Sequence, residues 1–176
     1  MPAWREMPVT AGKTPPALYT PEQRKRRDET RWTLVQGLLA PVQFLVFLIS
    51  LALVLRALLT GEGVGAASVS VVVKTIVLYT IMITGAIWEK KVFDVYLFAH
   101  AFFWEDVFSM LVLALHTAYL WALFTGSLTT QGQLLLALAA YGTYVINATQ
   151  FVLKLRAARL GAAAAQQQVS LEGATR

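Results

Sequence analysis

The chain contains no cysteine, and only 14% of its 176 residues are charged. The missing cysteines exclude disulfide frameworks, thiolate metal sites and thiol catalysis. The charged fraction is well below the roughly one quarter that is usual in soluble domains, while 57% of the residues are apolar. A soluble fold of this size could not bury so much apolar surface, so the composition indicates that the bilayer is the solvent.

The sequence also has no recognisable site for a nucleotide or a nucleic acid. Gly61, Gly63 and Gly65 are too few and follow no predicted strand, so they do not form a phosphate loop. The net charge of +5 comes from basic residues at the ends of apolar segments. That pattern is typical of membrane orientation rather than of a nucleic-acid groove, so we expect no nucleic-acid partner.

Four apolar stretches are long enough to cross a bilayer, which takes roughly 20 helical residues. They cover about 34–59, 67–88, 101–124 and 134–155. Continuous apolar runs such as LLLALAA lack the strict alternation of membrane β-strands. The sequence therefore predicts an all-α fold, an integral membrane four-helix bundle that forms one domain over 20–160.

The lysines and arginines fall on one side of these four spans. They precede the first span, separate the second from the third and follow the fourth, whereas the other two connections carry none. Because cytoplasmic loops are enriched in Lys and Arg, both termini are expected in the cytoplasm. The residues are Arg24, Lys25, Arg26, Arg27, Arg31, Lys90, Lys91, Lys154, Arg156 and Arg159.

A short basic helix is expected before the first span. Thr20 can cap it, Pro21 suits its first position, and Gln23 completes a capping box. We expect this helix to lie on the membrane surface. The segments 1–19 and 161–176 offer little to bury and are predicted to be disordered tails.

Polar residues line one face of three spans. Hydrogen bonds between helices explain any single one of them, but three stripes together favour a partly polar interior with a site. Arg56 and Lys74, near the outer ends of the first two spans, are expected to extend to the outer interface, where Glu62 could pair with either of them. The stripes are Gln36, Gln43 and Ser50; Glu105, Ser109, Val112, His116 and Tyr119; and Thr143, Asn147, Gln150 and Lys154.

The densest group of reactive side chains lies between the second and third spans, in WEKKVFDVYLFAHAFFWED. Helix-dipole effects and an interfacial aromatic belt account for each residue taken alone. Together they place several carboxyl groups at the mouths of two adjacent helices, walled by apolar rings. In such surroundings a carboxylic acid can keep a proton at neutral pH and donate it. The acids and histidine of this segment are Glu89, Asp94, His100, Glu105 and Asp106.

Long runs of the sequence resemble the vinyl bacteriochlorophyllide hydratase family of phototrophic bacteria. They are YTPEQRKRRDETRWTLVQGLLAPVQFLVFLISLALVLR, VVKTIVLYTIMITGAIWEKKVF, FFWEDVFSMLVLALHTAYL and YVINATQFVLKLRAARL, and the similarity covers about 19–160. The resemblance implies a lyase of bacteriochlorophyll biosynthesis in an inner or intracytoplasmic photosynthetic membrane. It would add water across the 3-vinyl group of chlorophyllide a, or of the related bacteriochlorin, to give the 3-(1-hydroxyethyl) product.

This chemistry needs an acid, a base and surroundings that stabilise the positive charge of a carbocation. It needs no cofactor. We expect Glu105 to be the acid and either Asp106 or Glu89 to be the base. Adjacent helical residues point about 100° apart, which makes Glu89 the better second carboxyl group.

The expected substrate is a flat magnesium-containing chlorin or bacteriochlorin with a propionate. Trp88, Phe103 and Trp104 would line its slot, and Lys90, Lys91 or Arg31 would bind the propionate. His100 could ligate the pigment's magnesium. His116, about 16 Å from Glu105 along the helix, could hold another edge.

The lipid bilayer and other enzymes of pigment biosynthesis are the remaining expected partners. A non-catalytic pigment-binding or assembly subunit would need the same slot, and the sequence alone leaves that alternative open.

Overall fold

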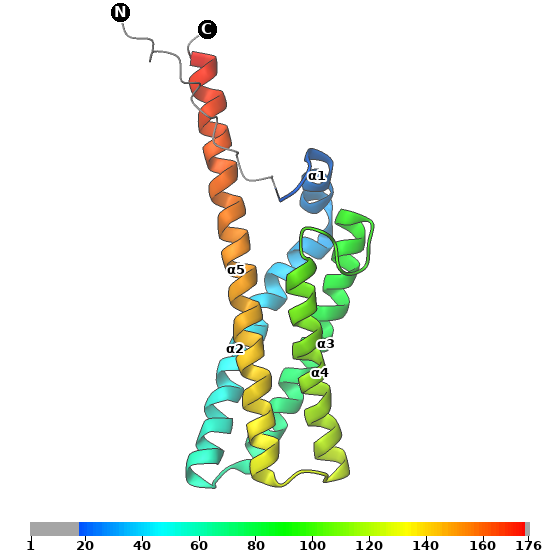
Figure 1. Ribbon diagram of the computed structural model, residues 1–176, viewed down its shortest axis with the longest axis vertical. Coiled ribbons are helices and arrows are strands. Elements are labelled where there is room, and N and C mark those ends of the chain that lie inside the picture. Colours follow the sequence, from blue (N-terminus) through cyan, green and yellow to red (C-terminus); the bar gives the residue numbers. More distant parts are fainter. Residues whose placement is uncertain (1–17, 175–176) are drawn as a thin grey trace, which may run out of the picture.

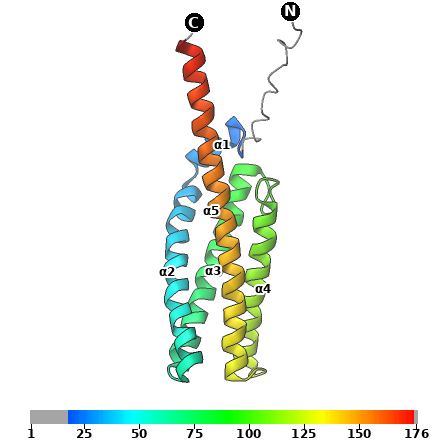
Figure 2. The same cartoon turned by 60° about the vertical axis from the view of Figure 1, so that its left-hand side comes forward.

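The computed structural model describes residues 18–174, which form five helices and no strand in that range. A short helix, α1 (Pro21–Glu29), precedes four long ones, α2 (Arg31–Thr60), α3 (Val64–Phe93), α4 (Phe103–Thr125) and α5 (Thr130–Ala174). The four long helices stand side by side as a bundle, with α1 at one end (Figures 1 and 2). The predicted all-α bundle is confirmed.

The start of α1 follows the predicted capping box. The Thr20 hydroxyl accepts a hydrogen bond from the Gln23 N–H at 3.2 Å, and the Gln23 side-chain oxygen accepts one from the Thr20 N–H at 2.9 Å. Pro21 occupies the first helical turn, where its missing N–H costs nothing. Thr30 is extended and separates α1 from α2.

All four long helices are long and apolar enough to cross a membrane, which confirms the four predicted spans. α2, α3 and α5 extend beyond the predicted apolar runs at both ends, because backbone geometry rather than hydropathy stops a helix, whereas α4 begins two residues after the predicted start. α2 and α4 end at Gly61 and Gly126, which adopt left-handed conformations with φ of 73° and 64°. The chain is therefore a multi-pass membrane protein.

The bundle is apolar outside as well as inside. Leu34, Leu59 and Phe124 are 76%, 84% and 79% exposed, as suits a surface that faces lipid. Inside, an apolar core is interrupted by the predicted polar stripes, whose buried members are Gln43, Ser50, Glu105, Ser109, His116, Tyr119 and Asn147.

Lys74 differs from the sequence-based expectation. It was predicted to extend to the outer interface, but it is fully buried and its Nζ lies 3.8 Å from the centre of the Tyr144 ring. The rotation of α3 about its axis turns Lys74 inward. Arg56 does pair with Glu62, at 3.4 Å, as predicted.

The two chain ends also differ in part from the prediction of disordered tails. α5 continues as helix past Gly161 to Ala174, because the AAAAQQQ stretch consists of good helix formers. Tyr19, at the end of the predicted N-terminal tail, is buried. The rest of that tail, 1–17, lies outside the described residues.

Candidate active site

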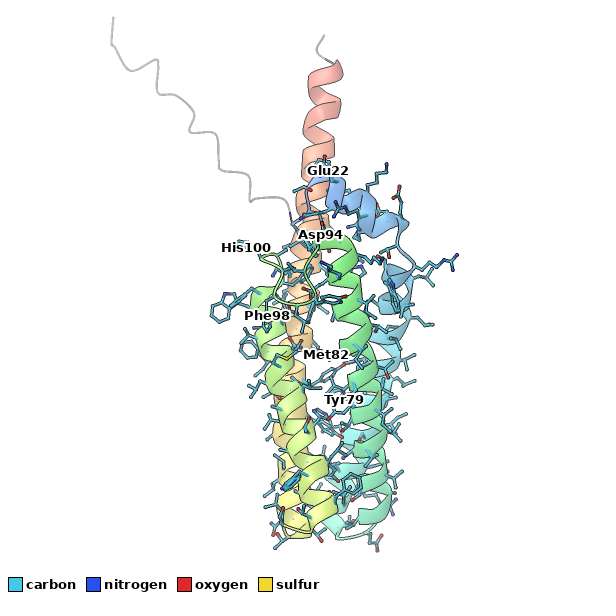
Figure 3. The ribbon with its side chains drawn as sticks, turned by 90° about the vertical axis from the view of Figure 1, so that its right-hand side faces the viewer. Glu22, Tyr79, Met82, Asp94, Phe98 and His100 are labelled. Atoms are coloured by element: carbon cyan, nitrogen blue, oxygen red, sulfur yellow. The ribbon has the colours of Figure 1, made fainter. Side chains whose placement is uncertain are left out.

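The loop between α3 and α4 closes the end of the bundle that also carries α1. Figure 3 shows Asp94, Phe98 and His100 in this loop, at the same end as Glu22 of α1. Asp94 and Phe98 both have positive φ, 66° and 61°. A left-handed conformation is tolerated by Asp but is unfavourable for a bulky residue such as Phe. Other contacts must therefore hold this loop.

Two buried carboxyl groups hold it. The Phe98 N–H donates to Oδ2 of Asp106 at 2.8 Å, and the Ala99 N–H donates to Oε2 of Glu89 at 3.2 Å. Because Phe98 and Ala99 are consecutive, the Glu89 and Asp106 carboxyl groups are held close together. Two buried carboxyl groups this close favour a state in which one of them is protonated. The two residues are 5% and 4% exposed and join α3 to α4. We call them the carboxyl pair.

Glu105 faces a different helix from its neighbour Asp106. Its Oε2 lies 2.5 Å from Nζ of Lys154 on α5, and its side chain is 8% exposed. The Lys154 ammonium also lies 5.1 Å from the centre of the Phe102 ring. The adjacent residues Glu105 and Asp106 thus face α5 and α3, respectively. This is expected because successive residues of a helix point about 100° apart.

Aromatic rings pack together beside the carboxyl pair. Phe102 lies 5.8 Å, centre to centre, from both Trp88 and Phe93, and 5.9 Å from Phe151. The Trp88 indole N–H is satisfied by the Thr33 hydroxyl at 2.9 Å. We call this group, together with Tyr19, the aromatic cluster: Tyr19, Trp88, Phe93, Phe102 and Phe151.

A salt bridge and a cation–π contact connect α1 to the site. Arg26 forms a salt bridge and hydrogen bond with Asp94, which hold the pKa of that carboxyl below its usual range. Arg27 lies 4.9 Å from the centre of the Tyr19 ring. Burial raises the pKa of the Tyr19 hydroxyl despite this cation.

The other predicted substrate-binding residues lie in two places. His100, Phe103, Trp104, Lys90 and Lys91 are exposed at the α3–α4 end. His116 is buried farther along α4, where its Nδ1–H donates to the Val112 carbonyl at 2.8 Å.

The structure thus brings Glu89, Asp106 and Trp88 together and keeps His116 apart from them. Sequence reasoning missed the pairing of Lys154 with Glu105 and the contributions of Tyr19 and Phe151. No local signal marks Phe151. Lys154 did stand on a polar stripe, but nothing in the sequence indicated its partner.

Comparison with known proteins identifies the family. The sequence profile described as 2-vinyl bacteriochlorophyllide hydratase matches residues 19–157. The chain belongs to this hydratase family. The matched segment contains the carboxyl pair, Glu105, Lys154 and the whole aromatic cluster.

Two relatives carry the same description. The 2-vinyl bacteriochlorophyllide hydratase of Cereibacter sphaeroides is 71% identical over 150 residues, which cover 85% of this chain and 92% of the relative. That of Rhodobacter capsulatus is 68% identical over 147 residues, 84% of this chain and 85% of the relative. No solved structure shows significant similarity to the chain. The resemblance described from the sequence is confirmed.

Proposed function

We propose that the carboxyl pair, Glu89 and Asp106, is the acid–base centre of a hydratase of bacteriochlorophyll biosynthesis. The chain is a hydratase by family membership. The observation that supports the site is that two buried carboxyl groups, from α3 and α4, bind consecutive N–H groups of the same loop. The substrate is a vinyl chlorin or bacteriochlorin. The ring carbon that carries the vinyl group is numbered 2 in the family description. The same carbon is numbered 3 in the systematic numbering used above.

The reaction adds water with the hydroxyl on the carbon next to the ring. One carboxyl group of the pair donates its proton to the terminal vinyl carbon, and the cation that forms beside the macrocycle is delocalised into it. Water attacks this cation, and its surplus proton passes to the carboxylate. The pair is then restored, and the product carries a 3-(1-hydroxyethyl) group. General acid–base assistance of this kind contributes about 10²–10⁴-fold.

The geometry favours the carboxyl pair over Glu105 as the acid. Glu105 is already bound by Lys154 at 2.5 Å, and a paired carboxylate has no proton to give. Its role in the proposal is electrostatic, because it adds negative charge at the end of the bundle where the cation develops.

The exposed rings of Phe103 and Trp104 and the partly buried rings of Trp88, Phe93 and Phe151 provide apolar surface for the macrocycle. Lys90, Lys91 and Arg31 are exposed at the same end and suit the propionate. His100 is exposed in the loop and could ligate the magnesium that the pigment itself carries.

The proposed orientation puts this site on the cytoplasmic side of the inner or photosynthetic membrane. The N-terminal end of α2, the α3–α4 loop and the C-terminal end of α5 all lie at the end marked by α1 (Figure 1). The basic clusters of the sequence lie at this end, which supports cytoplasmic termini and an interfacial position for α1.

Water labelled with heavy oxygen tests the reaction. Membranes that contain this protein as the only added enzyme should convert the vinyl pigment without oxygen, reductant or nucleotide. The product should gain the mass of one water molecule and carry the heavy oxygen on the carbon next to the ring. Label from molecular oxygen would contradict the proposal, and tight pigment binding without conversion would favour the alternative of a pigment-binding or assembly subunit.

A further inference from the structure

A second polar cluster lies inside the bundle, apart from the carboxyl pair. The Tyr141 hydroxyl and the Ser50 hydroxyl are 2.5 Å apart, and the His116 and Tyr141 rings lie 5.9 Å apart, centre to centre. Lys74 lies over the Tyr144 ring and close enough to His116 to interact electrostatically. All four long helices contribute to this interior layer, which consists of Ser50, Lys74, His116, Tyr119, Tyr141 and Tyr144.

Three polar groups of the interior layer have no hydrogen-bond partner within the described part of the chain. They are Nζ of Lys74, Nε2 of His116 and the Tyr119 hydroxyl, and each of these residues is 0% exposed. Buried polar groups are almost always satisfied, and a bundle surrounded by lipid has no bulk water to satisfy them. These three groups therefore need partners that the described part of the chain does not supply.

The hydrogen-bonding capacity of the layer identifies the class of ligand. Since the Nδ1–H of His116 donates to a carbonyl, Nε2 of the neutral ring is an acceptor. Lys74 is a donor, and the Tyr119 hydroxyl is both. A simple anion could accept from Lys74 but could not donate to Nε2 of His116, and a metal cation could bind Nε2 but could not accept from Lys74. Water donates and accepts, and buried water typically makes about three such bonds.

We propose that the interior layer is a water-binding site and that it supplies the water that hydration consumes. A stripe on α5 leads from the layer to Lys154 through Tyr144, Asn147 and Gln150, and the side-chain oxygens of the latter two have no partner within 18–174. The distance from His116 to Asp106 along α4 is about 15 Å. The supply role rests on the proposed function; the binding of water does not.

Hydroxyl-radical footprinting in water labelled with heavy oxygen tests the binding of water. The full-length protein in lipid nanodiscs is exposed to a short radiolysis pulse, and oxidised peptides are analysed by mass spectrometry. Tyr119 and Tyr141, 0% and 2% exposed, should gain heavy oxygen because bound water lies beside them. Phe44, which is exposed to lipid, should not. Labelling of Tyr119 and Tyr141 no higher than that of Phe44 would overturn the proposal.

Two variants of α3 form a matched pair. Lys74→Met removes a layer donor and should cause loss of the Tyr119 label. Thr75→Val alters a neighbour that is equally buried but whose hydroxyl already donates to the Val71 carbonyl at 2.8 Å, so the label should persist. Equal labelling in the two variants would show that the label does not report water in the layer.

Thermal unfolding gives a second measurement that needs no labelling. In a dry layer Tyr119→Phe removes an unsatisfied hydroxyl and raises the Tm. In a hydrated layer the substitution removes a hydroxyl that is hydrogen bonded to a bound water molecule. That water molecule then lacks one hydrogen-bond partner, so the Tm falls. A higher Tm in Tyr119→Phe would overturn the proposal.

The supply role has a separate readout. Lys74→Met should lower kcat for the vinyl pigment at unchanged KM, because it acts on the reactant water and not on pigment binding. If Lys74→Met loses the heavy-oxygen label at Tyr119 but keeps the kcat of the wild type, the supply role is wrong. Failure of the proposed function is distinguishable, since it would appear as activity retained in variants of the carboxyl pair with the Tyr119 label intact.

Discussion

At the scale of single residues, the carboxyl pair serves the fold and the proposed chemistry with the same atoms. The two acceptor oxygens bind the Phe98 and Ala99 N–H groups, which fixes the side chains in position. In the proposed reaction, the pair also supplies the proton that vinyl protonation requires. A site that is locked in place in this way avoids the rotamer freedom that would otherwise slow proton transfer.

We predict that Glu89→Gln and Asp106→Asn each lower the hydration rate about 10²–10⁴-fold. Each amide keeps an acceptor oxygen for the loop N–H, so the protein should still insert and pack, while the exchangeable proton of the acid is lost. The measurement is turnover of vinyl pigment in membranes, normalised to the amount of inserted protein.

Glu62→Gln is the matched control, because Glu62 lies at the opposite end of the bundle in an exposed pair with Arg56. It should leave the rate unchanged. Activity within a few-fold of the wild type in both carboxyl-pair variants would reduce Glu89 and Asp106 to loop-holding groups.

Some of these residue positions were readable from the sequence and others were not. Glu89 was predicted at the same depth as Glu105 because each lies at the end of an apolar run; the closeness of Glu89 to Asp106 was not. The burial of Lys74 was not, since it depends on the rotation of α3 about its axis. The Glu105–Lys154 pair joins residues 49 positions apart, and a stripe of polar residues does not show which helix it faces.

At the scale of elements, α1 is held against the α3–α4 loop largely by Arg26 and Asp94. The capping residues of α1 were visible in the sequence because capping is local. Its docking was not, because the partner Asp94 lies 68 residues away. The helical continuation of α5 was missed for another reason. A lack of apolar residues suggested disorder, whereas alanine and glutamine favour helix by intrinsic propensity.

The Asp94 contact gives α1 docking a pH dependence of defined sign. The pKa of Asp94 is lowered by Arg26 in the folded protein from its ordinary value of 3.8. The contact therefore contributes fully above that ordinary value and is lost as the pH falls through the lower folded value. We predict that Asp94→Asn at pH 7 lowers the protection factors of the α1 amides against hydrogen exchange. Acidification should lower the same protection factors in the wild type, after correction for the slower intrinsic exchange at low pH.

Asp28→Asn is the control for α1. Asp28 pairs with its neighbour Arg27 inside the same helix, so its loss should leave the docking of α1 unchanged. Exchange in α1 that does not respond to Asp94→Asn would mean that the Tyr19 contacts alone hold this helix.

At the scale of the whole molecule, the outward apolar surface and the inward polar stripes agree with a bundle that has lipid as its solvent. The four spans were predictable because a helix of about 20 apolar residues matches the thickness of the hydrocarbon layer. Which way the bundle faces rests on the distribution of Lys and Arg alone.

Single cysteines test this orientation without interference, because the natural chain has none. Cysteines at Glu62 and Ser127, both exposed in the connections without basic residues, should react with a membrane-impermeant maleimide added from the periplasm. A cysteine at Tyr96 or Ala163, exposed at the other end, should react only after the membrane is opened. Labelling of Ala163→Cys in intact cells would invert the proposed topology.

The left-handed backbone at Phe98 has a consequence for the proposed reaction. An unfavourable conformation persists only while its restraint lasts, and here the restraint is a hydrogen bond to Asp106. A carboxylate accepts a hydrogen bond more strongly than a carboxylic acid. If Asp106 is the member of the pair that carries the proton, the bond to the Phe98 N–H is weaker before proton transfer and stronger after it. The strain at Phe98 is then coupled to the protonation state of the site.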